Sequence, residues 1–160
     1  MRPFEIIAGL PPEQYAQVMT RIAQEAPDVF RQTVASAAAA LKFRPRFLAK
    51  QPLPKRIASL RRVLVRPASD PLAEELLAIY FLKCRLDLLG EWLDLVGLEH
   101  EDGILTADEV PCPDASLLEE KVKTLRSGED PDCELLLRVF AAQSAIDWPA
   151  LEEILTRPGS

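Results

Sequence analysis

The only histidine of the chain stands in an acidic stretch, which is where metal chemistry would be expected. Four carboxylates surround His100: Glu99, Glu101, Asp102 and Asp108. Imidazole and carboxylate groups are ligands that suit zinc, manganese or iron. Side chains adjacent in sequence do not all point at one ion, so we expect no metal ion and no cofactor here. Instead, His100 is expected to pair with a carboxylate or to interact with the end of the preceding helix.

Arg85 is the second residue with potential chemistry. It lies in the longest apolar stretch, and at 100° per residue it projects into the face that carries Phe81 and Trp92. It is therefore the one charge of that stretch expected to be partly buried. Arg85 is suited to clamping an anionic ligand, although a structural ion pair with Glu74 or with the acidic loop over 98–113 is the preferred interpretation. A metal- or small-molecule-dependent enzyme would require Arg85 and His100 to line one concave pocket.

Sequence motifs of the common catalytic sites are absent. There is no G-x-x-x-x-G-K-[ST], H-E-x-x-H or G-x-S-x-G motif, and a single histidine leaves little scope for nucleophilic hydrolysis. The three cysteines, Cys84, Cys112 and Cys133, have no C-x-x-C spacing and form neither a zinc site nor a disulfide framework. We therefore predict no catalytic residues, a protein that is not an enzyme, and a cytoplasmic location.

Charge is distributed very unevenly along the sequence. No acidic residue occurs between Asp28 and Asp70, whereas ten basic residues do. Residues 70–160 contain 21 acidic and 7 basic residues. The ten bases are Arg31, Lys42, Arg44, Arg46, Lys50, Lys55, Arg56, Arg61, Arg62 and Arg66.

Part of this basic segment has the composition of a nucleic-acid contact. Between residues 42 and 47, bases alternate with Phe43 and Phe47, as in segments that bind phosphates and stack bases. Helical spacing aligns further bases on one outer face between residues 55 and 66. The candidate polyanion-binding residues are therefore Lys42, Arg44, Arg46, Lys55, Arg62 and Arg66.

A structural role for the same bases is the alternative. The basic half would then dock against the acidic half, within the fold or in a homodimer, with Phe43 and Phe47 as core residues. The formal net charge of −6 and the pI near 4.9 also count against nucleic acid, because most dedicated binders are basic over the whole domain. Nucleic acid is therefore kept as an alternative and is not favoured from the sequence.

Apolar residues recur with helical periodicity along most of the chain, and prolines separate the periodic segments. The pattern predicts about seven helices, with a short turn near 46–50. A long central helix over about 71–96 is expected to be packed by antiparallel helical hairpins. The predicted helices cover residues 13–26, 27–42, 55–65, 71–96, 117–126, 131–144 and a segment that begins near 148.

The sequence therefore predicts an all-α protein that forms a compact bundle. With 160 residues, of which 48% are apolar and 28% charged, we expect one globular domain over 1–157 and a short tail over 158–160. Charges within the longest apolar stretch predict no membrane span. The function most consistent with helical hairpins that carry no catalytic set is a protein–protein interaction or scaffold domain, with a protein partner or a second copy as its ligand.

Overall fold

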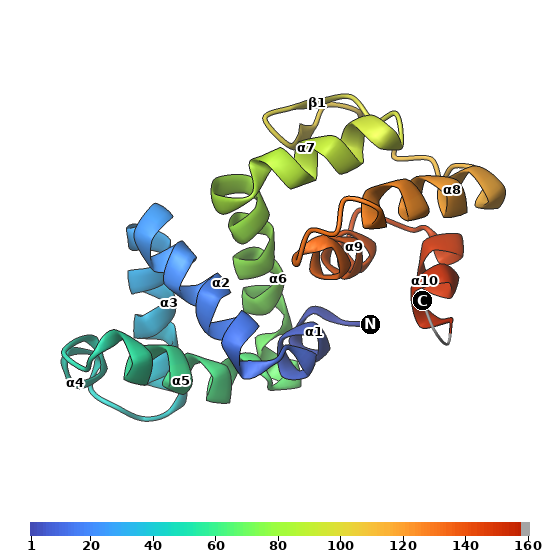
Figure 1. Ribbon diagram of the computed structural model, residues 1–160. Helices are drawn as coiled ribbons and strands as arrows, with labels where there is room; N and C mark the ends of the chain where they lie inside the picture. The colour runs from blue at the N-terminus through green and yellow to red at the C-terminus, as the bar shows by residue number, and fades with distance from the viewer. Residues whose placement is uncertain (158–160) are drawn as a thin grey trace. The chain divides into compact units, whose positions relative to one another are not determined.

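The structure is a computed structural model that describes residues 1–157, and it confirms an all-α fold (Figure 1). In the described part of the chain, about 70% of the residues are helical and there are ten α-helices, where about seven were predicted. The only strands in the described part form one short hairpin. No helix within residues 1–157 is both long enough and apolar enough to cross a membrane. The predicted tail over 158–160 lies outside the described residues.

Contacts divide the chain into two compact units. The N-terminal unit comprises Arg2–Cys84, and the C-terminal unit comprises Met1 and the chain from Arg85 onward. This division does not test whether the two units fold independently, so the single domain over 1–157 stays a prediction. Each unit is described by itself below.

The N-terminal unit consists of helices that mostly begin with proline. Its elements are α1 (Pro3–Gly9), α2 (Pro12–Glu25), α3 (Pro27–Ala40), α4 (Pro45–Ala49), α5 (Leu53–Leu64), the 3₁₀ turn η1 (Pro67–Ser69), α6 (Asp70–Ile79) and the π-helical segment η2 (Tyr80–Cys84). Proline occupies the first or second position of all six α-helices. It fits there because the N–H that it lacks has no partner within the helix. The prolines thus mark helix starts, as predicted.

The core of this unit lies where α3 meets its neighbours. Helix α3 packs against α2, α4 and α5, and its small residue Ala37 is fully buried, which lets neighbouring helices approach closely. Ile22 of α2 and Leu60 of α5 are equally buried. The Tyr15 hydroxyl donates a hydrogen bond to the Ile57 carbonyl at 2.8 Å, which joins α2 to α5.

The predicted continuous helix over 71–96 is wrong. Helix α6 passes into η2, and α7 (Leu86–Leu95) begins only after Arg85, whose φ of −134° and ψ of 42° are not helical. The apolar period continues through this point, so the sequence pattern alone does not reveal the break. At this break, the side chain of Arg85 hydrogen-bonds to carboxylates that are distant in sequence. π-helical turns such as η2 occur mostly as single-turn interruptions of α-helices.

The C-terminal unit continues from α7 through a hairpin to three more helices. These elements are β1 (His100–Glu101), β2 (Ile104–Leu105), α8 (Ala115–Arg126), α9 (Cys133–Ala142) and α10 (Pro149–Thr156). The loop predicted over 98–113 thus contains an antiparallel pair, with positive φ at Asp102 and Gly103 in the connecting turn. In the core, the Phe140 ring meets Trp92 and Trp148 edge to face, at 5.8 and 5.0 Å between centroids.

Candidate functional site

All six predicted polyanion-binding residues are exposed in the structure, and so is Lys50. Their side chains form no ion pair or hydrogen bond within residues 1–157. We call these seven residues the basic surface: Lys42, Arg44, Arg46, Lys50, Lys55, Arg62 and Arg66.

The other three bases of the segment are engaged with the fold. Arg56 donates to the Gln51 carbonyl at 3.0 Å, and Arg61 donates to the Leu10 carbonyl at 2.7 Å. Arg31 forms an exposed ion pair with Asp28 at 3.4 Å. Three of the ten bases therefore form contacts within the N-terminal unit, whereas the other seven are exposed to solvent.

At the start of the basic surface, the backbone is held by hydrogen bonds typical of a helix C-terminus. Beyond α3, the N–H groups of Phe43 and Lys42 donate to the carbonyls of Ala38 and Ala39, at 2.8 and 3.1 Å. This pattern is a Schellman motif, which requires a left-handed residue after the helix. Lys42 occupies that position with φ of 60°, although glycine is the usual residue there.

Helices α4 and α5 both lie against α3, along the lower edge of the N-terminal unit in Figure 1. Leu48 anchors α4 because its side chain is only 1% exposed. Ile57 and Leu60 bury the inner side of α5, which leaves Lys55 and Arg62 on the outside, as predicted. Arg66 lies beyond the end of α5, in the turn before η1, and not on the helix as predicted.

The two phenylalanines of the basic segment lie together but differ in burial. Their rings meet edge to face with centroids 5.7 Å apart and an interplanar angle of 69°. Phe43 is half-buried, whereas Phe47 is 56% exposed. The expectation that both are core residues is therefore wrong for Phe47. No signal in the local sequence distinguishes the two, although Phe43 precedes α4 and Phe47 lies within it.

A cavity of about 400 Å³ opens beside α4 within the N-terminal unit. Apolar side chains make up most of its wall, and Arg31 and Arg56 are its only charged lining residues. Arg56 also lies over the ring of Phe30, 5.7 Å from its centroid. Within residues 1–157 no carboxylate lines this cavity, although Asp28 pairs with the lining residue Arg31 at 3.4 Å.

The formal charges of the two units have opposite signs. The N-terminal unit contains 13 basic and 7 acidic residues, a net charge of +6. The C-terminal unit contains 6 basic and 18 acidic residues, a net charge of −12. The overall charge of −6 therefore does not describe the unit that carries the basic surface.

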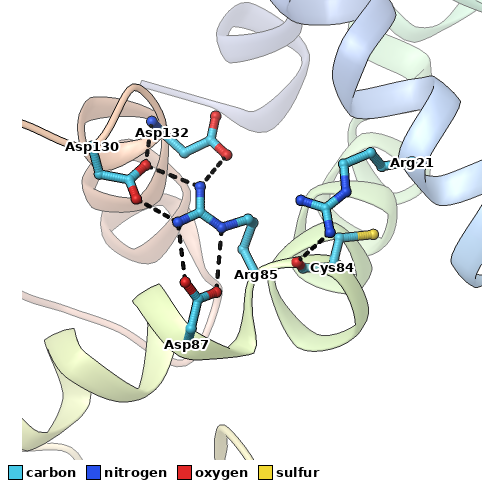
Figure 2. A network of polar contacts seen from close by, with 6 residues as sticks. All are labelled: Arg21, Cys84, Arg85, Asp87, Asp130 and Asp132. Carbon is cyan, nitrogen blue, oxygen red and sulfur yellow. Dashed lines mark hydrogen bonds and ion pairs between the residues drawn. The ribbon is translucent and has the colours of Figure 1, made fainter.

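Arg85 forms a structural charge cluster in the C-terminal unit (Figure 2). Its guanidinium donates to Asp130 at 2.9 Å and to Asp132 at 2.8 Å, and it contacts Asp87 at 3.3 Å. The hydrogen bond from Arg85 lowers the pKa of the Asp130 and Asp87 carboxyls and raises that of the guanidinium. The preferred prediction of an ion pair was correct, but its partners are neither Glu74 nor the 98–113 loop.

The segment that provides these partners also differs from the prediction. The helix predicted over 131–144 begins later, because α9 starts at Cys133, with Asp132 at its N-cap. Asp130 accepts a hydrogen bond from the Asp132 N–H at 2.9 Å and so holds a turn ahead of the helix. With its donors directed at carboxylates, Arg85 is not available to an anionic ligand.

His100 is held by its own hairpin and by a carboxylate of α7. Its Nδ1 accepts a hydrogen bond from the Gly103 N–H at 3.1 Å, so Nε2 carries the proton and donates to Asp94 at 3.0 Å. The predicted pairing with a carboxylate is thus correct. A cavity of about 530 Å³ adjoins His100, but Arg85 is not among its lining residues. Within residues 1–157, no group of three or more potential ligands is placed to hold a metal ion.

Comparison with known proteins yields no relative. No protein-family model, curated protein or solved structure matches the chain. What the protein does must therefore be inferred from its own residues. Of the sites predicted from the sequence, Arg85 and His100 are engaged with neighbouring groups, and the basic surface is the one that stays open.

Proposed function

We propose that this chain is a non-catalytic binding domain whose basic surface binds nucleic acid. The observation that supports the proposal is a run of seven exposed cations with no protein partner within residues 1–157. The run covers residues 42–66 and contains no acidic residue. Lysine and arginine at such positions are suited to contacting successive phosphates of a polyanion.

Electrostatics explains why a ligand of opposite charge would be favoured. The cations of a unit with a net charge of +6 repel one another, and this repulsion is relieved when a polyanion replaces the surrounding counterions. Release of those counterions is the main driving force for nonspecific binding to nucleic acids, and it weakens as salt rises. The +6 charge of the N-terminal unit removes the objection based on the net charge of the whole chain.

A protein–protein interaction or scaffold role, with a protein partner or a second copy as ligand, stays a prediction. It was the preferred hypothesis from the sequence. The separate expectation of a structural role for the bases included two buried phenylalanines, and Phe47 is exposed. A cytoplasmic location is also proposed, since Cys84, Cys112 and Cys133 are all free thiols.

Fluorescence anisotropy with labelled 20-nucleotide DNA, single-stranded and duplex, tests the proposal on the full chain. If about six phosphates are contacted, log K should fall with log salt with a slope of about −4 for a single strand and about −5 for a duplex. Heparin provides a polyanion without bases, and an acidic peptide provides a protein-like ligand.

Two matched double variants show where binding occurs. Arg44→Glu/Arg46→Glu and Lys121→Glu/Lys123→Glu change the net charge equally, but only the first alters the basic surface. The first should weaken DNA binding at least tenfold, and the second should change it less than twofold. No binding to either DNA at 50 mM salt, or equal loss in both variants, would overturn the proposal. Binding to the acidic peptide alone would favour the protein-partner hypothesis.

A further inference from the structure

Phe47 is a large apolar side chain exposed within a strongly cationic surface. Four large apolar residues are exposed within residues 1–157, and Phe47 is the one that belongs to the basic segment. Arg44 and Arg46 lie three residues and one residue before it, and Lys50 lies three residues after it. An exposed aromatic ring that is surrounded by cations is the combination found where nucleic-acid bases stack on proteins.

Local packing orients the ring and keeps one part of it open. Leu48, the next residue in α4, is buried, and so the two neighbouring side chains project to different sides of this short helix. The half-buried ring of Phe43 contacts Phe47 edge to face and supports it. Because Phe43 already restricts the side chain of Phe47, less conformational entropy is lost when a ligand binds.

We propose that the basic surface takes single-stranded nucleic acid, with one base stacked on the ring of Phe47 and the flanking phosphates bound by Arg44 and Arg46. This inference rests on the proposed function and specifies the class of nucleic acid. The choice of a single strand follows from the two kinds of side chain at α4, the cationic arginines and the aromatic Phe47. Cations contact phosphates in any polyanion, whereas a flat apolar ring gains only from a ligand with an accessible π face.

Duplex DNA fits this arrangement less well. Its bases are stacked on each other and paired, so a ring on a protein surface meets a base face only if the base is unstacked. In a single strand the bases are splayed out and available for stacking. Duplex binding is therefore expected to depend on the cations alone and to be insensitive to Phe47.

Four ligands of matched length separate stacking from charge: single-stranded DNA, the same strand with abasic sites in place of bases, duplex DNA and heparin. The full chain should bind the intact strand about tenfold more tightly than the abasic strand. Phe47→Ala should weaken binding of the intact strand by about 5- to 100-fold, the range for loss of one stacking aromatic side chain. The same variant should change binding of the other three ligands less than twofold.

Two further variants serve as controls. Phe47→Trp keeps a stacking face and should retain binding of the intact strand within about threefold. Leu117→Ala removes another exposed apolar side chain, outside the basic surface, and should have no effect. Because Phe47 is exposed, circular dichroism of Phe47→Ala should match that of the unmodified protein, which confirms that the variant folds.

The outcomes distinguish this inference from the proposed function. Equal affinity for intact and abasic strands, with no effect of Phe47→Ala, would overturn stacking and leave nucleic-acid binding by charge alone. Failure of all four ligands to bind at low salt would overturn both. A preference for duplex over single strand would also overturn the inference.

Discussion

The guanidinium of Arg85 lies 2.8 Å from the carboxylate of Asp132, a residue 47 positions further along the chain. Both side chains are largely removed from water, with exposed fractions of 13% and 11%. A charge in such a position must be matched by an opposite one, because its lost hydration is costly. Arg85 is therefore a stabilising centre of the C-terminal unit, and its contacts lead to two predictions.

Replacing Arg85 should destabilise the C-terminal unit strongly. Arg85→Met leaves Asp130 and Asp132 without their cation and should cost about 3 kcal/mol of unfolding free energy. Tryptophan fluorescence during urea denaturation reports this, since both tryptophans, Trp92 and Trp148, belong to the C-terminal unit. The matched control is Arg157→Met in the same unit, whose ion pair with Glu119 is exposed and should contribute less than about 0.5 kcal/mol. Similar losses in both variants would contradict the prediction.

Acid stability should depend on the same cluster. The hydrogen bond from Arg85 holds the pKa of Asp130 below its usual range. Its stabilising effect is therefore present above pH about 4, the unfolded-state value, and is lost as pH falls through the lowered folded-state pKa. In Arg85→Met the lowering disappears, so Asp130 should no longer contribute to the loss of stability, and the free energy of unfolding should fall less between pH 4 and pH 2 than in the unmodified protein. Urea denaturation followed by tryptophan fluorescence at several pH values measures this difference, and equal losses in both proteins would contradict the prediction.

Lys42 should be replaceable by glycine with a gain in stability and a loss of affinity. Its positive φ costs an L-residue about 1 kcal/mol, and glycine avoids this cost. Lys42→Gly should therefore stabilise the protein by about 1 kcal/mol in urea denaturation followed by circular dichroism. Lys42→Ala should not, since it removes the charge but keeps the left-handed conformation. Both variants should weaken DNA binding to the same small extent. A gain in stability in Lys42→Ala as well as in Lys42→Gly would contradict the prediction.

The three thiols should differ in reactivity according to burial. Burial raises the pKa of Cys133 to about 11, because its desolvated thiolate is disfavoured. Cys112 is exposed, and Cys84 is half-buried. Alkylation at pH 8 with peptide mass spectrometry should therefore modify Cys112 first and leave Cys133 unmodified until urea unfolds the C-terminal unit. Rapid labelling of Cys133 in the native protein would show that α9 opens readily.

Helices with a clear one-sided apolar pattern were predictable from the sequence. Predicted segments 13–26 and 27–42 agree with α2 and α3 to within two residues, because an apolar stripe and a proline start are both local features. Helix α1 has only seven residues, too few for a periodic pattern, and it was missed. The break at Arg85 was missed because the apolar period continues through it, and the contacts of Arg85 with Asp130 and Asp132 are too distant in sequence for local periodicity to detect.

The candidate site was predicted in part for the same reasons. Helical spacing correctly placed Lys55 and Arg62 on the exposed side of α5. The exposure of Phe47 was not predictable, because a large aromatic residue in a short helix is often buried and only the packing of α4 on α3 decides which of its side chains face solvent. The overall net charge does not describe the N-terminal unit, because the two units carry formal charges of opposite sign.

The central claim is that the basic surface is a nucleic-acid site, and mapping the contact by NMR tests it most directly. The full chain, labelled with ¹⁵N, would be titrated with a ten-nucleotide single-stranded DNA at 50 mM salt. Amide shift changes should concentrate in residues 42–66, be largest near Phe47 and leave residues 85–157 nearly unchanged. Changes concentrated in residues 85–157, or none at all with DNA in excess, would contradict the claim.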